Sequence, residues 1–150
     1  LYRNFQGYTT HAGCDLFAFG VSAISNVGRT YAQNNKNSRE YEAVIRSGQP
    51  ATVRGLRMTD EDLLRRDVIM RLMCDFSLDM RSIGSRWGID FRRHFAQSLE
   101  LLRPLESDGL IRIDEALVEV TPAGRLLIRN ICMAFDEHLS ETSAQFSRTV

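Results

Sequence analysis

The second half of the chain carries an ordered series of helix and strand signals, and this series constrains the fold most. Thr59 is suited to begin a helix because its hydroxyl can accept a backbone N–H, and three acidic residues follow it at the positive end of the helix dipole. The spacing predicts a helix that runs through Cys74. Leu64, Val68 and Leu72 form its apolar stripe and predict which face is buried.

Two more helices are expected after the first. A short helix at residues 82–87 should end at Gly88, since glycine adopts the left-handed conformation that terminates helices. Asp90 is suited to cap a longer helix that ends near Gly109. Apolar residues recur on one face of that longer helix, which indicates that it packs against a core.

A β-hairpin and a last helix complete the series. Residues 110–113 and 117–120 alternate between apolar and polar, and a short turn separates them. Thr121 and Pro122 then provide a cap and a proline at the first helical position, which predicts a helix to about Leu139. Helices, a hairpin and a final helix in this order predict a winged-helix-like domain.

The first 35 residues have a different composition, which is rich in glycine, asparagine and aromatic residues. Residues 16–21 form a short, almost wholly apolar run, which predicts a strand buried on both faces in a parallel sheet. The polar residues 22–28 would then lie at the carboxyl end of that strand, where α/β folds bind ligands. Its partner strands would have to precede Leu1. One helix is expected at residues 37–47.

Composition excludes several classes of function. Nineteen basic residues balance nineteen acidic ones, which argues against a dedicated nucleic-acid binder. No apolar stretch is long enough to cross a membrane. Cys14, Cys74 and Cys132 are about 60 residues apart, so no metal site is expected in this segment, and free thiols fit a reducing cytoplasm. The start at Leu1 predicts a cut through a longer protein.

Residues 3–10 and 20–25 together suit a flat, partly apolar cofactor. Phe5 and Ile24 can contact an aromatic ring, and the Gln6 amide both donates and accepts hydrogen bonds. Glycines in both stretches let the backbone approach closely. On spacing alone, an ordinary loop over a barrel rim is the favoured interpretation of these residues.

Several blocks of sequence resemble the oxygen-independent coproporphyrinogen III oxidases, which are radical S-adenosylmethionine enzymes. They are RNFQGYTT from Arg3, GVSAIS from Gly20, RRDVI from Arg65, GRLLIRNICM from Gly124, and the ending Phe146-Ser147-Arg148. The related haem chaperones typically carry an asparagine-leucine pattern near Asn4 and a glycine-alanine-histidine turn near Ser22. This chain departs from both patterns, which favours the oxidases.

The resemblance implies an enzyme of haem biosynthesis. A [4Fe-4S] cluster held upstream would cleave S-adenosylmethionine, and the resulting radical would start the oxidative decarboxylation of two propionates of coproporphyrinogen III to vinyl groups, giving protoporphyrinogen IX. Two molecules of S-adenosylmethionine are implied for each site. Ile24 matches a position that contacts the second molecule, with Phe5 and Gln6 beside it. No catalytic residue is expected in this segment, which would be inactive alone.

The predicted fold is α+β. Residues 1–55 would form the end of a radical S-adenosylmethionine α/β barrel and a linking helix, and residues 56–150 a mainly helical, winged-helix-like C-terminal domain with a small antiparallel hairpin. The expected partners are coproporphyrinogen III and an electron donor, without nucleic acid or membrane. A cytoplasmic monomer is expected.

Two alternatives remain open from the residues alone. A winged helix can bind DNA, with Arg92, Arg93 and Arg103 on phosphates. Acidic residues offset these arginines, which favours a solvated helix face instead. The other alternative is a radical S-adenosylmethionine haem chaperone.

Overall fold

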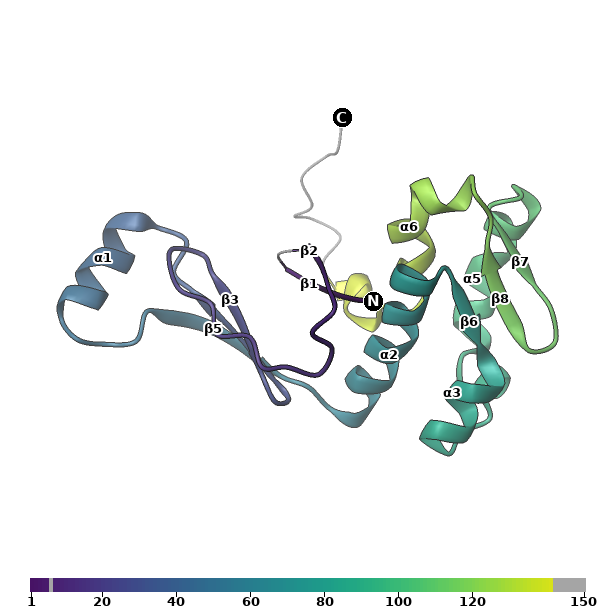
Figure 1. Ribbon diagram of the computed structural model, residues 1–150, viewed down its shortest axis with the longest axis horizontal. Helices are drawn as coiled ribbons and strands as arrows, with labels where there is room; N and C mark the ends of the chain where they lie inside the picture. The colour runs from purple at the N-terminus through teal and green to yellow at the C-terminus, as the bar shows by residue number, and fades with distance from the viewer. Residues whose placement is uncertain (6, 142–150) are drawn as a thin grey trace. The chain divides into compact units, whose positions relative to one another are not determined.

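The computed structural model describes residues 1–5 and 7–141 (Figure 1). Gln6 and the Phe146–Arg148 ending lie outside the described residues. The chain divides into two compact units, Leu1–Leu63 (unit 1) and Leu64–Val150 (unit 2). Both combine helices with small antiparallel sheets, which confirms the α+β class. In the described part of the chain, no helix has the length and apolar character needed to cross a bilayer.

Unit 1 is built from two antiparallel sheets. Its strands are β1 (Tyr2–Asn4), β2 (Gly7–Thr9), β3 (Ile24–Val27), β4 (Thr30–Asn34) and β5 (Thr52–Arg57). The first two form a hairpin, and the others form a sheet in the order β3-β4-β5. The predicted helix is present as α1 (Ser38–Arg46), between β4 and β5, and the side chain of Asn37 caps it through the N–H groups of Arg39 and Glu40.

The strand predicted at residues 16–21 does not form within the described chain. Only Leu16 pairs, through two backbone hydrogen bonds to Asn26. Phe17 and Phe19 expose 66% and 91% of their surface. A continuous apolar run forms a buried strand only when neighbouring strands and covering helices enclose it, and the described residues supply neither.

The first long helix is close to its predicted position. It is α2 (Asp60–Asp75), and Thr59 exchanges capping hydrogen bonds with Asp62: the Asp62 N–H donates to the Thr59 hydroxyl at 3.1 Å, and the Asp62 carboxylate accepts the Thr59 N–H at 2.7 Å. Leu64, Val68 and Leu72 are buried, as their spacing predicts. The start of α2 is therefore fixed by atoms three residues apart.

The short helix begins earlier than expected. It is α3 (Met80–Trp87), and Asp79 caps it by accepting the N–H groups of Arg81 and Ser82. Gly88 ends it with a φ of 66°, as predicted. The residues before the cap form a strand that the sequence did not indicate, β6 (Ser77–Asp79). The predicted hairpin is confirmed as β7 (Ile111–Ile113) and β8 (Leu117–Val120), and the sheet order is β6-β8-β7.

Two predicted helices are divided in the structure. The helix after Asp90 consists of α4 (Phe91–His94) and α5 (Ala96–Ser107), separated at Phe95. The last helix is replaced by η1 (Gly124–Leu127), α6 (Ile128–Met133) and η2 (Glu137–Glu141). The Phe95 ring explains the first division, because it is buried against the rings of Phe91 and Phe135, at centroid distances of 4.7 and 5.5 Å.

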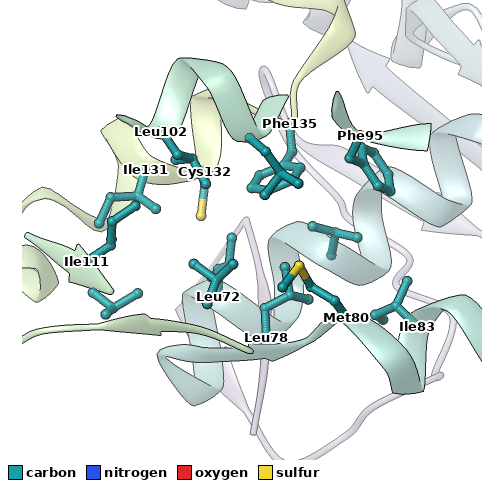
Figure 2. Close-up of a cluster of buried hydrophobic side chains, with 14 of the residues drawn as sticks. Leu72, Leu78, Met80, Ile83, Phe95, Leu102, Ile111, Ile131, Cys132 and Phe135 are labelled. Carbon is teal, nitrogen blue, oxygen red and sulfur yellow. The ribbon is translucent and has the colours of Figure 1, made fainter. Parts of the chain in front are cut away.

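One apolar core holds unit 2 together. It draws side chains from the five α-helices α2 to α6 and from the β6-β8-β7 sheet (Figure 2). Leu72, Leu78, Leu102, Ile131 and Phe135 are fully buried within it. Burial of a side chain of this size contributes about 1.5–3 kcal/mol. Unit 1 is different, because only Ala51 and Met58 are buried among its described residues.

Candidate functional site

Phe5 lies at the tip of the β1–β2 hairpin. Asn4 is paired with Gly7, and Phe5 directly follows the first strand of the hairpin. Gly7 has a φ of 130°, a backbone conformation that side chains disfavour and glycine adopts readily. The Phe5 side chain is 61% exposed. The hairpin therefore presents an aromatic ring at its turn.

Ile24 begins β3 directly after a constrained turn. Ser22 has a φ of 59°, in the left-handed region that non-glycine residues rarely occupy. The turn is held by the N–H of Ser22, which donates to the Asn35 carbonyl at 2.9 Å, and by the N–H of Ala23, which donates to the Gly20 carbonyl at 3.4 Å. Strained turns of this kind concentrate at functional sites, and this one fixes where Ile24 enters the sheet.

The structure brings Phe5 and Ile24 to one face of the β3-β4-β5 sheet. The rings of Phe5 and Tyr31 meet edge to face, with centroids 5.6 Å apart and planes at 85°. Tyr31 is paired with Asn26, so both side chains lie on the same face. Ile24 precedes Asn26 by two residues and shares that face, since strand side chains alternate. We call Phe5, Ile24, Asn26 and Tyr31 the aromatic face.

The aromatic face has a distinct chemistry. It combines two aromatic rings and an aliphatic side chain, all half-buried or exposed. Burial raises the pKa of Tyr31 above its ordinary value, so its phenol stays neutral. The Oδ1 atom of Asn26 is buried, and no described residue donates a hydrogen bond to it. An apolar surface with aromatic rings suits a flat, partly apolar ligand.

Two of the four residues of the aromatic face were not predicted from the sequence. Tyr31 and Asn26 became part of the site only through strand pairing. The signal that could have revealed them is the β3–β4 hairpin itself, since Gly28 and Arg29 join two alternating stretches by a two-residue turn. Gln6, the third predicted site residue, lies outside the described residues. The roles of Phe5, Gln6 and Ile24 in cofactor binding stay a prediction.

A metal centre does not assemble among the described residues, where no group of three His, Cys, Asp or Glu side chains comes together. Cys14 is exposed, Cys74 is half-buried and Cys132 is buried. The Cys132 thiol lies 3.8 Å from the carbonyl oxygen of Ile69, which is a structural contact.

Two of the three arginines considered for DNA binding make internal contacts. Arg92 donates to the carbonyl oxygens of Asp114 and Glu115. Arg103 forms ion pairs with Glu100 and Glu106, at 3.8 and 3.2 Å. The α5 face is therefore neutralised by its own acidic residues, which favours the solvated interpretation over a nucleic-acid surface.

The comparison with known protein families identifies the second half of the chain. Residues 58–127 match the family model of the HemN C-terminal domain. The matched segment begins just before α2 and ends at Leu127. This confirms the resemblance predicted from the sequence.

Individual HemN relatives match the chain over its whole length. It is 48% identical over 152 residues to the oxygen-independent coproporphyrinogen III oxidase of Escherichia coli K12, covering 100% of this chain and 33% of the relative. The oxidase of Pseudomonas aeruginosa PAO1 is 46% identical over 151 residues, with the same coverage. The chain therefore spans about a third of the length of these HemN relatives.

A solved structure agrees with the HemN assignment. It is that of coproporphyrinogen III oxidase (HemN) from Escherichia coli, a radical SAM enzyme, and the match has a TM-score of 0.84 at 50% identity. It covers 92% of this chain and 32% of the solved one. Because the match includes nearly all of the chain, the fold of both units is that of HemN.

Proposed function

We propose that this chain is the C-terminal part of an oxygen-independent coproporphyrinogen III oxidase. The full protein would convert two propionates of coproporphyrinogen III to vinyl groups with loss of CO₂, giving protoporphyrinogen IX. The observation that carries the proposal is the 46–48% identity to such oxidases over the whole length of the chain. At this identity, related proteins share their fold, and the solved relative is a radical SAM enzyme, which supports the same chemistry.

The proposal includes a [4Fe-4S] cluster, bound by residues outside this segment, and two molecules of S-adenosylmethionine. When bound, these groups would supply the radical that removes a hydrogen atom from each propionate. The aromatic face fits an adenosyl group in its chemistry. Adenine has apolar faces, and the aromatic face offers the rings of Phe5 and Tyr31 together with Ile24.

In this proposal, the residues of the chain bind and shield rather than react. Ile24 and Phe5 would form an apolar wall against the second S-adenosylmethionine, and Gln6 would offer its amide beside them. Such a wall excludes water, which protects a radical reaction from side reactions. No residue of this segment is assigned a catalytic step.

The proposed domain organisation divides the chain at residue 55. Residues 1–55 would be the end of the catalytic barrel and a linking helix. The exposed apolar side chains of Phe17, Phe19 and Val53 support this division, since apolar surface of this extent is normally covered by other protein. Residues 56–150 would be a winged-helix-like domain, which the order α2-β6-α3-α4-α5-β7-β8 supports.

The remaining partners follow from the same chemistry. An electron donor must supply the reduced cluster, and coproporphyrinogen III is the substrate. We further propose that the protein acts as a monomer in the cytoplasm, without nucleic acid or membrane.

The direct test is turnover by the complete protein that contains this chain. It would be purified without oxygen, reduced, and given coproporphyrinogen III with S-adenosylmethionine, and the products separated by chromatography. We expect protoporphyrinogen IX to form only when S-adenosylmethionine is present. Cleavage of S-adenosylmethionine without decarboxylated product would reject the substrate, and haem transfer without oxidase activity would point to the chaperone alternative.

A further inference from the structure

Phe5 lies on a hairpin that has little stability of its own. Each strand of the β1–β2 hairpin has three residues, and an isolated two-stranded hairpin is marginal in water. The Phe5 ring is mostly exposed, yet it meets the Tyr31 ring at 5.6 Å. The contact joins the tip of this hairpin to the larger sheet of unit 1. The position of Phe5 therefore depends on what holds Tyr31.

Tyr31 is held firmly because it lies in the central strand of its sheet. It is paired with Asn26 of β3 on one side and with Leu56 of β5 on the other. A shift of Tyr31 would disrupt both ladders, and a slip by one residue would turn its ring to the opposite face. Burial raises the pKa of its phenol, consistent with a ring enclosed by its neighbours.

The same pairing relates Tyr31 to Ile24. Ile24 is opposite Gln33, and Tyr31 is the next residue of β4 on that face. Diagonal neighbours in a sheet are about 7–8 Å apart, within reach of an aromatic side chain. Tyr31 therefore stands between the residue at the hairpin tip and the residue that begins β3.

We propose that Tyr31 is a positioning residue for S-adenosylmethionine, because its ring holds Phe5 on the sheet face that carries Ile24. The inference rests on the proposed function and adds a residue to the same site. The part of Tyr31 that matters is the ring, since the contact with Phe5 is edge to face. Tyr31→Phe should therefore keep Phe5 in place, whereas substitution of Tyr31 by an aliphatic residue should not.

The test measures binding of S-adenosylmethionine to the complete, cluster-loaded protein by equilibrium dialysis with labelled ligand. Wild type is expected to bind two molecules. Tyr31→Leu should weaken one of the two by about tenfold, near the upper limit for an aromatic pair, while Tyr31→Phe should match wild type. Tyr31→Leu should also raise KM for S-adenosylmethionine with little change in kcat at saturation. Tyr41→Leu removes a tyrosine from α1 as a matched control and should change neither value.

A double-mutant cycle separates positioning from a general structural role. If Tyr31 acts through Phe5, then Tyr31→Leu should add nothing to the loss caused by Phe5→Leu. If the Tyr31→Leu variant does not fold, Tyr31→Val is used in its place, because the β-branched side chain of valine favours strands.

The outcomes distinguish the two proposals. If wild type is an active oxidase and Tyr31→Leu binds both molecules normally, the role of Tyr31 is rejected alone. Additive effects in the cycle would reject it too. A wild-type protein without turnover that depends on S-adenosylmethionine would reject the proposed function together with this inference.

Discussion

Gly124 packs directly against the backbone of Leu110, and no space remains there for a Cβ atom. A Cβ at this position would collide with the Leu110 carbonyl and lie 3.0 Å from the Val120 side chain. The contact joins the start of η1 to the β7–β8 hairpin. It is made possible by Thr121, whose hydroxyl accepts the N–H of Gly124 at 3.2 Å and donates to the Leu110 carbonyl at 3.0 Å.

Gly124→Ala should destabilise the protein strongly. The added methyl group must displace backbone, and such overpacking costs about 1–3 kcal/mol or more. Urea unfolding would measure the change. Leu126→Ala is the control in the same segment, because Leu126 is 88% exposed, and it should change the free energy of unfolding by less than about 0.5 kcal/mol. Equal effects of the two substitutions would contradict the packing argument.

The Asp67 carboxylate should contribute more to the free energy of unfolding than the exposed ion pairs do. Its side chain is 18% exposed and accepts hydrogen bonds from Arg86 at 2.8 Å and from the Trp87 indole at 3.0 Å, which joins α2 to α3. Hydrogen bonds to a charged group contribute about 1.5–3 kcal/mol, so Asp67→Ala should lower the unfolding free energy by about that amount.

Glu100→Ala provides the comparison for Asp67. This substitution removes an ion pair with Arg103 in which the Glu100 side chain is largely exposed, and such pairs contribute about 0–1 kcal/mol. Thermal unfolding of the two variants side by side would show whether burial matters. A loss for Glu100→Ala as large as that for Asp67→Ala would refute the distinction.

The turn of the β7–β8 hairpin should be sensitive to acid. The Asp114 carboxylate accepts the N–H groups of Ala116 and Leu117, at 2.8 and 2.7 Å, and these bonds hold the pKa of Asp114 below its ordinary value, with smaller contributions from Arg92 and Arg81. The ionised form is favoured by folding. Its stabilising effect is therefore present above the unfolded pKa of about 3.9 and is lost as the pH falls through the lower folded value.

Asp114→Asn tests this acid dependence, because the amide oxygen can still accept hydrogen bonds but does not titrate near this pH. Melting temperatures would be compared between about pH 6 and pH 2. We expect the difference between wild type and variant to shrink toward the acid end. A difference that stays constant over the whole range would rule out a role for Asp114 ionisation.

Removal of the Asn26 side-chain amide should raise the stability of the protein. Its buried Oδ1 has no hydrogen-bond donor among the described residues, and an unsatisfied buried acceptor costs about 1–3 kcal/mol. Asn26→Leu should therefore raise the free energy of unfolding of the ligand-free protein. Asn34→Leu is the matched control on the neighbouring strand and should lower it, since the Asn34 amide donates to the Gly20 carbonyl at 3.0 Å. Destabilisation by both would show that Asn26 has a partner.

Ile24→Asp should abolish turnover in the complete protein while leaving the fold and the cluster intact. A charge at this position would meet an apolar ligand surface and lose its hydration. Activity would be assayed with coproporphyrinogen III, and cluster content by absorbance. Ile45→Asp places the same charge on α1, away from the aromatic face, and should remain active. Normal activity of Ile24→Asp would remove Ile24 from the site.

Elements with local start and stop signals were predictable from the sequence. Asn37, Thr59 and Asp90 cap helices through atoms within three residues of themselves, and Gly88 ends one through its own backbone. Such signals are present in the sequence regardless of the tertiary structure. This is why these helix ends were close to their predicted positions.

Features that depend on distant contacts were not predictable. The division of a long helix at Phe95 requires the ring of Phe135, 40 residues away along the chain. Residues 16–21 have the composition of a buried strand, and among the described residues only Leu16 is paired. Of the site, Phe5 and Ile24 came from the family resemblance, while Tyr31 and Asn26 required the strand register.

Among its described residues, unit 1 buries only Ala51 and Met58, and this bears on how such proteins can change over evolution. In the proposed enzyme, the large apolar residues of unit 1 could be exchanged only in step with the surfaces that cover them, so unit 1 should co-vary with the remainder of the protein. Unit 2 holds its own core and is freer to diverge. Chimaeras between relatives should therefore tolerate an exchange of the unit 2 core more readily than an exchange of unit 1.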